Sequence, residues 1–281
     1  MADDRTTFWN RLLATRRRRV ALGVIVAVVV ALAVIAGVVI WGGSSGHEVT
    51  PDEAGKRLDT ATSIAPVRGV LRPAQGVYRY RGSGTDELST PPKQQTEGPD
   101  MPATVTHRAD GCWTFRIDYH SNHWQSWDYC ATDGRLEEQG GSTYQRWDFG
   151  VFASETTSTF ACDSSVTIRL DAEPGDEWNQ ACGSVAGADS AASTSSGPYR
   201  FVGAETMTIG GEPVEALHYH RERAMAGGQR GTERSEVWFA AADGLPLRNE
   251  RRIEVSTDTV IGETTYSEVA DFELLSTAPE P

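Results

Sequence analysis

The amino-acid sequence predicts a mainly β protein with a single N-terminal transmembrane helix, one short helix after it, and a large curved antiparallel sheet of half-barrel type. Three observations indicate this fold class. An apolar run, Val20–Trp41, directly follows four arginines. From Gly76 onward, apolar and polar residues alternate in segments separated by turn residues, which is typical of half-buried strands. All four cysteines lie beyond the apolar run, where disulfides form if that part of the chain is outside the cell.

The apolar run is long enough to cross a membrane. As a helix at 1.5 Å per residue it would span roughly 33 Å, about the thickness of a bilayer's hydrocarbon core. Arginine-rich flanks stay in the cytoplasm, so the block Arg16–Arg19 orients the chain. We therefore predict a cytoplasmic tail (1–19), a transmembrane helix (20–41), a stalk (42–49), an extracytoplasmic β domain (50–275) and a short tail (276–281).

Two other interpretations of this run were weighed. A cleaved signal peptide has a shorter apolar region that ends in a small-x-small cleavage site, whereas this run ends in Val38, Val39, Ile40 and Trp41. A lipoprotein would need a cysteine just after the run, and the first cysteine is Cys112. The sequence therefore predicts an uncleaved anchor in the cell membrane of a bacterium, a source suggested by the high Ala, Gly, Arg and Asp content.

The charge of the exterior part excludes nucleic acid as a partner. The chain has 26 basic and 39 acidic residues, and the cytoplasmic tail holds six and two of them. The exterior is left with 20 basic and 37 acidic residues, a net charge of −17. Nucleic-acid binding requires a basic face, and none is visible in the sequence.

The exterior part begins with a helix signal. Thr50 is suited to cap the helix, Pro51 to occupy its first position, and Glu53 to complete a capping box. The helix would run to about Ala61 and end before Pro66. The next segment, Gly76–Gly82, alternates as a strand, while residues 83–102 contain four prolines and few apolar groups and are predicted to form a long loop.

The rest of the chain is predicted to consist of strands in series. Candidate strands in the middle are 104–108, 135–139, 142–149 and 158–161, followed by a mobile Gly/Ala/Ser-rich segment at 183–197. The last third is the most regular, with strands at 199–209, 212–221, 232–242, 245–256 and 263–275. The pairs Gly210-Gly211 and Asp243-Gly244 are hairpin turn signals. Sequential hairpins predict a large antiparallel sheet that is strongly curled or partly closed.

Four cysteines allow three disulfide connectivities, and the alternation of residues favours one. A hairpin centred on Ser121 places Cys112 opposite Cys130, with apolar side chains sharing the other face. Cys162 and Cys182 similarly flank an alternating segment and a turn at Pro174-Gly175. We predict Cys112–Cys130 and Cys162–Cys182, each worth on the order of 3 kcal/mol. The wide spacing and the lack of a C-x-x-C pair argue against a zinc site.

The apolar face of this hairpin carries the candidate ligand-lining residues Trp113, Phe115, Tyr119, Trp127 and Tyr129. They form either the plain core of the sheet or the lining of a groove for an acyl chain or an apolar peptide. A cavity of several hundred Å³ would favour the second interpretation.

One segment near the C-terminus resembles a known family. Val237-Trp238-Phe239 followed by Asp243-Gly244-Leu245-Pro246-Leu247-Arg248 is similar to a strand pair of bacterial envelope lipid and lipoprotein carriers, the LolA-like domains and the LppX/LprG-type lipoproteins. The resemblance covers about the last 45 residues. It implies an N-terminal helix, a curved antiparallel half-barrel with an apolar concave face, and lipid binding. This chain lacks the lipidated cysteine of the mycobacterial group.

Constellations with catalytic or metal-binding potential were weighed separately. Gly42–Gly46 matches G-x-S-x-G but lacks the strand and helix that the motif requires. His120 and His123 at the hairpin tip, with His218 and His220 on one later strand, would supply metal ligands only if those elements met in space. Asp118, Asp128 and Glu137 are candidate paired carboxylates, and Arg116 is expected to form a cross-strand ion pair with one of the aspartates.

None of these patterns identifies an active site, a cofactor or a metal. The sequence favours a non-enzymatic envelope domain that binds a lipid or apolar ligand. The alternatives are a sensor or accessory subunit that binds a membrane protein, and thirdly an extracytoplasmic hydrolase.

Overall fold

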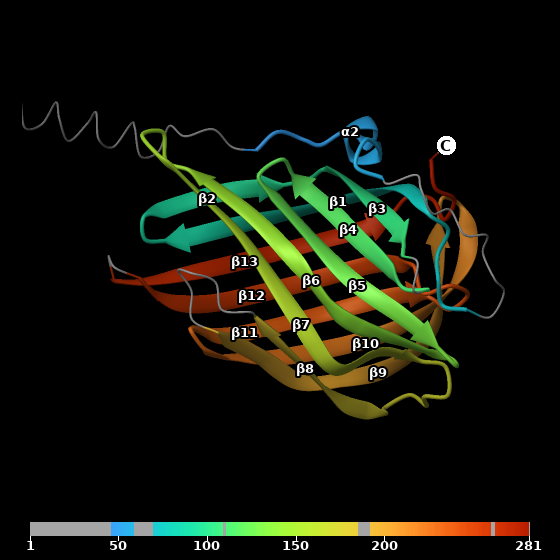
Figure 1. Ribbon diagram of the computed structural model, residues 1–281. Helices are drawn as coiled ribbons and strands as arrows, with labels where there is room; N and C mark the ends of the chain where they lie inside the picture. Colours follow the sequence, from blue (N-terminus) through green and yellow to red (C-terminus); the bar gives the residue numbers. More distant parts are fainter. Residues whose placement is uncertain (1–45, 59–69, 109–110, 185–191, 260–261, 281) are drawn as a thin grey trace, which may run out of the picture. The chain divides into compact units, whose positions relative to one another are not determined.

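The computed structural model describes residues 46–58, 70–108, 111–184, 192–259 and 262–280 (Figure 1). The chain divides into two compact units, Met1–Ser44 with Asp148–Ala153, and Ser45–Trp147 with Ser154–Pro281. The predicted cytoplasmic tail and transmembrane helix (1–41) lie outside the described residues. Within the described ranges, no helix combines the length and apolarity needed to cross a membrane.

The helix predicted after residue 50 is present but short. α2 spans Pro51–Gly55, and its capping box is the predicted one: Glu53 N–H donates to Thr50 Oγ1, and Thr50 N–H donates to Glu53 Oε2. The helix ends at Gly55 rather than near Ala61. The chain before it is held in place, because His47 N–H donates to Ser121 Oγ at 3.0 Å.

The second unit is an antiparallel sheet closed on itself. Within the described ranges it has 13 strands. Their bounds are β1 (Gly76–Ser89), β2 (Pro92–Glu97), β3 (Asp100–His107), β4 (Trp113–His120), β5 (His123–Thr132), β6 (Arg135–Asp148), β7 (Ala153–Arg169), β8 (Glu177–Ser184), β9 (Ser193–Ile209), β10 (Glu212–Gly227), β11 (Gln229–Ala240), β12 (Pro246–Thr259) and β13 (Gly262–Leu274).

The predicted half-barrel is therefore wrong in one respect, because the barrel is complete. The last strand, β13, pairs with β1 from Tyr80↔Leu274 to Leu88↔Tyr266. Pairing of the two end strands leaves no free edge in the ring, which removes the aggregation hazard of an open sheet. β2 lies outside this ring and pairs with the distal half of β1, while β3 pairs with its first half. Figure 1 shows β4–β7 crossing in front of β10–β13.

The loop predicted at 83–102 is also wrong, since this stretch contains the second half of β1, all of β2 and the start of β3. Its prolines misled the prediction because they are concentrated at strand boundaries. Pro91 lies between β1 and β2, Pro92 is the first residue of β2, and Pro99 lies between β2 and β3. A proline at a strand's first position does not interrupt the ladder.

Residues 135–139 and 142–149, predicted as two strands, form the single strand β6. The glycines between them belong to the strand and accompany a register shift opposite Asp128 and Tyr129. A Cβ on Gly141 would lie 2.0 Å from the Ser126 carbonyl oxygen, so the close approach of β5 requires glycine there. A glycine pair usually indicates a turn, which is why two strands were predicted. Here the pair lies at a β-bulge within one strand.

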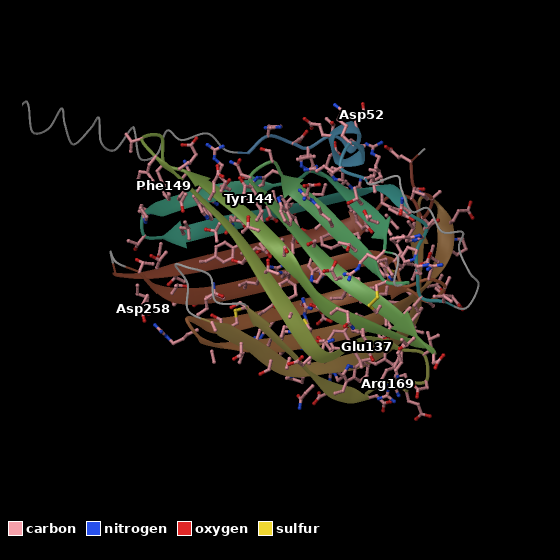
Figure 2. All side chains as sticks on the ribbon, in the orientation of Figure 1. Asp52, Glu137, Tyr144, Phe149, Arg169 and Asp258 are labelled. Atoms are coloured by element: carbon pink, nitrogen blue, oxygen red, sulfur yellow. A yellow bond between two sulfur atoms is a disulfide. The ribbon has the colours of Figure 1, made fainter. Side chains whose placement is uncertain are left out.

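The two predicted disulfides are confirmed. Cys112–Cys130 flanks the β4–β5 hairpin, whose register pairs Trp113 with Tyr129. Cys162 and Cys182 are direct partners in the β7–β8 ladder. Figure 2 shows both as yellow bonds. The turns at Gly210-Gly211 and Asp243-Gly244 are also confirmed. Strands β9 and β10 are longer than predicted, and β11–β13 match the predicted strands to within three residues at each end.

Candidate functional site

Aromatic side chains fill one part of the barrel interior. Ring contacts run from Trp113 through Tyr129, Phe239 and Tyr219 to Tyr199, with centroids 4.7–6.5 Å apart. The space beside Tyr129, Tyr199 and Phe239 is only about 20 Å³, room for roughly one water molecule. This part of the barrel is therefore a packed core.

A layer of buried charges lies next to the aromatic core. It consists of three arginines and three glutamates from five strands: Arg221, Arg223, Arg251, Glu138, Glu233 and Glu268. Arg221 Nη2 donates to Glu233 at 2.6 Å and Arg223 Nη2 donates to Glu138 at 3.2 Å. Arg251 Nη2 donates to Glu268 at 3.2 Å. Charges removed from water require such pairing, and the layer is balanced in formal charge.

Beyond the charged layer the interior opens into a cavity of about 460 Å³. All six charged residues of the layer contribute to its lining. Its apolar lining includes seven further side chains: Leu88, Trp127, Trp147, Phe160, Met225, Ile253 and Val255. Within the described residues, Arg223 Nε, Arg251 Nε and Glu268 Oε1 make no hydrogen bond. The volume lies in the range of small-molecule sites, and the lining combines an apolar wall with hydrogen-bonding groups.

The charged layer predicts a loss of stability in acid. Burial alone would raise the pKa of Glu233, but the charges of Arg221, Arg251 and Arg223 together lower it to about 2. A lowered carboxyl pKa stabilises the fold above the unfolded-state value of about 4.3. That contribution, on the order of 3 kcal/mol, is lost as the pH falls from about 4.3 to 2. Urea denaturation across this range should show a flatter pH dependence for Glu233→Gln than for wild type. Glu254→Gln, on the exposed face of the adjacent strand, should leave it unchanged.

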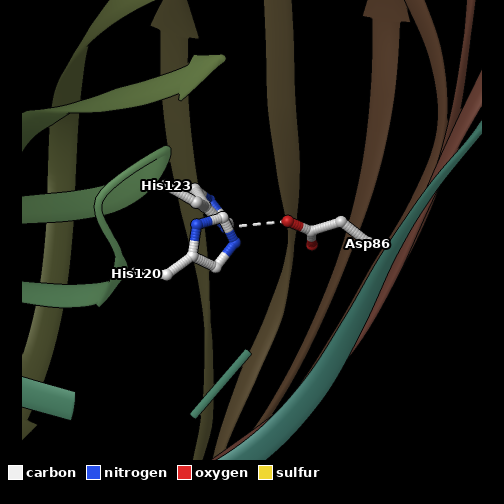
Figure 3. A group of neighbouring side chains, drawn as sticks. All are labelled: Asp86, His120 and His123. Atoms are coloured by element: carbon white, nitrogen blue, oxygen red, sulfur yellow. Dashed lines mark ion pairs between the residues drawn. The ribbon is translucent and has the colours of Figure 1, made fainter. Parts of the chain in front are cut away.

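A second buried polar cluster lies near the termini of four strands. Asp86 is near the end of β1, Glu97 ends β2, His120 ends β4 and His123 begins β5. His123 Nδ1 is 2.8 Å from Glu97 Oε1 and 3.0 Å from Asp86 Oδ2. Figure 3 shows the Asp86 carboxylate and the two imidazole rings pointing toward one another. All four side chains are at most 3 % exposed.

Neighbouring groups connect this cluster to the cavity. Gln145 Nε2 donates to Asp86 Oδ2 at 3.2 Å, and Tyr266 Oη donates to Asp86 Oδ1 at 3.1 Å. Gln145 and Tyr266 both line the cavity. Gly84 makes room for the cluster, since a Cβ there would lie 2.4 Å from Glu97 Oε2.

The ionisation of this cluster is set by burial and by its own charges. Burial raises the pKa of Glu97 to about 8 against the hydrogen bond from His123, with Asp86 adding to the rise. Burial opposes charge on Asp86 and His123 as well, but their mutual attraction lowers the pKa of Asp86 and raises that of His123. Burial lowers the pKa of His120 to about 4, helped by His123.

The predicted ligand-lining residues lie in different parts of the barrel. Trp113 and Tyr119 are fully buried, while Phe115 and Tyr129 border only the small space of about 20 Å³. Trp127 lines that space and the large cavity. Whether these side chains contact a ligand stays a prediction.

The other predicted candidates are not brought together. His218 Nε2 and His220 Nδ1 share Glu236, at 2.8 and 2.6 Å, on the outer face of the barrel. Asp118 forms its ion pairs with Arg57 and with Arg116, which is on the same strand rather than across the ladder.

Asp128 instead accepts a hydrogen bond from Thr114 Oγ1 at 2.5 Å. Glu137 faces Cys130 in the β5–β6 ladder.

The arginines and glutamates of the charged layer were not among the residues predicted from the sequence. The sequence of β10 did indicate them. Tyr219, Arg221 and Arg223 occupy alternate positions of this strand, so their side chains share one face of it. Charged residues at core-facing positions are rare unless they are paired. Which glutamates meet them depends on barrel closure, which alternation along one strand does not reveal.

Comparisons with known proteins identify no family. No family model and no curated protein matches the chain. Among solved structures, the hypothetical lipoprotein YmcC from Escherichia coli K12 is similar at 12% identity. The match covers 82% of this chain and 99% of that chain, with a TM-score of 0.30.

Proposed function

We propose that this chain is a membrane-anchored, extracytoplasmic binding protein of the bacterial envelope that holds an amphiphile, such as a lipid, inside its barrel. The observation that carries the proposal is the cavity of about 460 Å³. Its apolar wall suits an acyl chain, and the charged layer offers hydrogen-bonding groups to a polar head. Catalysis is not part of the proposal.

The location is supported by the sequence and by the cysteines. Arg16–Arg19 and the apolar run after them have the charge and length of a signal anchor. All four cysteines of the chain form disulfides, which persist in oxidising compartments. The LolA-like resemblance fits an envelope location and a lipid ligand.

Native mass spectrometry of the segment Gly46–Pro281, secreted through an oxidising compartment, tests this function. The segment holds all the strands that the structure describes, and both disulfides. A bound lipid, recovered by organic extraction, is the expected result, and a stripped sample should bind added oleate. A sample that carries no lipid and does not bind oleate would contradict the proposal.

A cavity-filling variant provides the structural control. Val255 lines the cavity, and Glu254 beside it faces outward. Val255→Trp is expected to reduce oleate binding at least roughly 10-fold, since its ring would occupy the space of the acyl chain, at a stability cost of about 1–3 kcal/mol. Glu254→Trp adds the same side chain outside and should bind oleate as wild type does. Equal binding by both variants would place the oleate elsewhere.

A second candidate function is docking to a membrane protein partner. Two large apolar side chains near the β6–β7 turn favour it, because Val151 is 69 % and Phe152 54 % exposed. Exposed apolar residues often mark protein or membrane contacts. If the secreted segment carries no ligand but co-purifies with an envelope protein through this turn, this candidate becomes the better explanation.

A further inference from the structure

We propose that Asp86, Glu97, His120 and His123 form a binding site for one divalent transition-metal ion, of which zinc is the representative. The site is separate from the acyl-chain cavity in its residues and in its chemistry. The metal-site proposal can therefore be tested independently of the proposed lipid function.

The spacing of the donor atoms supports this site. Ligand atoms around a tetrahedral zinc ion, with bonds of about 2.0–2.2 Å, lie about 3.3–3.6 Å from one another. His123 Nδ1 is 2.8 Å from Glu97 Oε1 and 3.0 Å from Asp86 Oδ2. Asp86, His120 and His123 each offer a ligand atom within 4.8 Å of the others. Small shifts would therefore convert the hydrogen-bonded group into a coordination shell.

Unpaired buried atoms give a second, independent indication. Glu97 Oε2 and His120 Nε2 make no hydrogen bond with any described residue, although both side chains are at most 3 % exposed. Leaving a buried polar atom without a partner is unfavourable, and a coordinated cation would supply a partner to both atoms.

The type of donor indicates which metals fit. Two imidazoles and two carboxylates, with no thiolate, suit zinc, manganese or ferrous iron rather than cuprous copper. The site borders the open cavity, because Gln145 and Tyr266 contact Asp86 and also line that cavity. The Tyr266 hydroxyl lies 3.1 Å from Asp86 Oδ1 and 2.6 Å from Glu268 Oε2, so its single proton is shared between two carboxylates and Asp86 is oriented from outside the site.

His120 is the weakest of the four ligands. Its Nδ1 accepts a hydrogen bond from the Asn122 N–H at 3.1 Å, so a neutral ring carries its proton on Nε2. Coordination through Nε2 moves that proton to Nδ1, which can then no longer accept from the Asn122 N–H, so this hydrogen bond is lost. His123 and the two carboxylates therefore supply most of the affinity.

The test measures zinc bound to the full chain, purified in detergent with its disulfides intact. After dialysis against a chelator, the protein is titrated with zinc sulfate, desalted and analysed by elemental mass spectrometry. One retained zinc per chain, together with a higher Tm, is expected. A wild-type chain that retains no zinc overturns the proposal without any variant.

Variants then locate the ion. Glu97→Gln is close to isosteric and can still accept the hydrogen bond from His123, so it should fold. It is expected to weaken zinc binding roughly 10–100-fold, and His123→Ala at least as much. The matched control is His218→Ala, which removes a histidine of the outer-face pair on Glu236 and should leave zinc binding unchanged. Loss of zinc in the control but not in Glu97→Gln would assign the ion to the outer pair and refute the buried site.

Discussion

Arg221→Ala is expected to lower the free energy of unfolding by roughly 3–5 kcal/mol, measured by urea denaturation at neutral pH. The guanidinium donates to Glu233 at 2.6 Å and to Ser235 Oγ at 3.0 Å, and its Nη1 lies 3.8 Å from Glu138. Its loss leaves Glu233 buried, and among the described residues its one remaining ion-pair contact is Arg251 Nε, 3.8 Å away. The layer would then carry an uncompensated negative charge in a low-dielectric interior.

Two variants separate charge from packing in this prediction. Arg230 forms an ion pair with Asp258, and both side chains are at least 50 % exposed, so Arg230→Ala should cost no more than about 1 kcal/mol. The double variant Arg221→Met/Glu233→Leu removes both members of the buried pair and should recover most of the stability lost in Arg221→Ala. If the double variant is as unstable as the single one, the buried charge is not the cause.

Local patterns predicted much of this barrel because the relevant interactions are local. The capping box at Thr50 and the Cys112–Cys130 hairpin depend on residues close in sequence, and both are confirmed. Closure was missed because the β1–β13 pairing joins residues nearly 200 positions apart, such as Tyr80 and Leu274. No alternation within either strand specifies its neighbour in space.

The candidate sites were harder to predict for the same reason. His120 and His123 were recognised as a pair, but their partner Asp86 lies in the segment interpreted as a loop. Once residues 83–89 are placed in β1, the alternation of Gly84, Asp86 and Leu88 points one carboxylate into the barrel. An error in one element therefore concealed the whole cluster.

Trp113→Ala is the second change expected to have a large effect, lowering the free energy of unfolding by roughly 3–5 kcal/mol. Trp113 is 0 % exposed and its ring lies 4.7 Å from that of Tyr129. Its Nε1–H donates to the Leu71 carbonyl at 3.0 Å, which fastens the segment before β1 to the barrel. Truncation leaves a cavity in a packed region and an unpaired carbonyl, and both effects are destabilising.

The same hairpin supplies the control for this variant. Trp124 lies on the outer face, half-buried, where Arg116 stacks 3.9 Å from its ring centroid. Trp124→Ala removes a ring of the same size but should cost only about 1 kcal/mol, the value of a solvated cation–π contact with modest burial. Both variants should retain the Cys112–Cys130 disulfide, which mass spectrometry can verify. Equal destabilisation by the two changes would mean that the hairpin's inner face is not the packed core of the barrel, and that the aromatic side chains line open space instead.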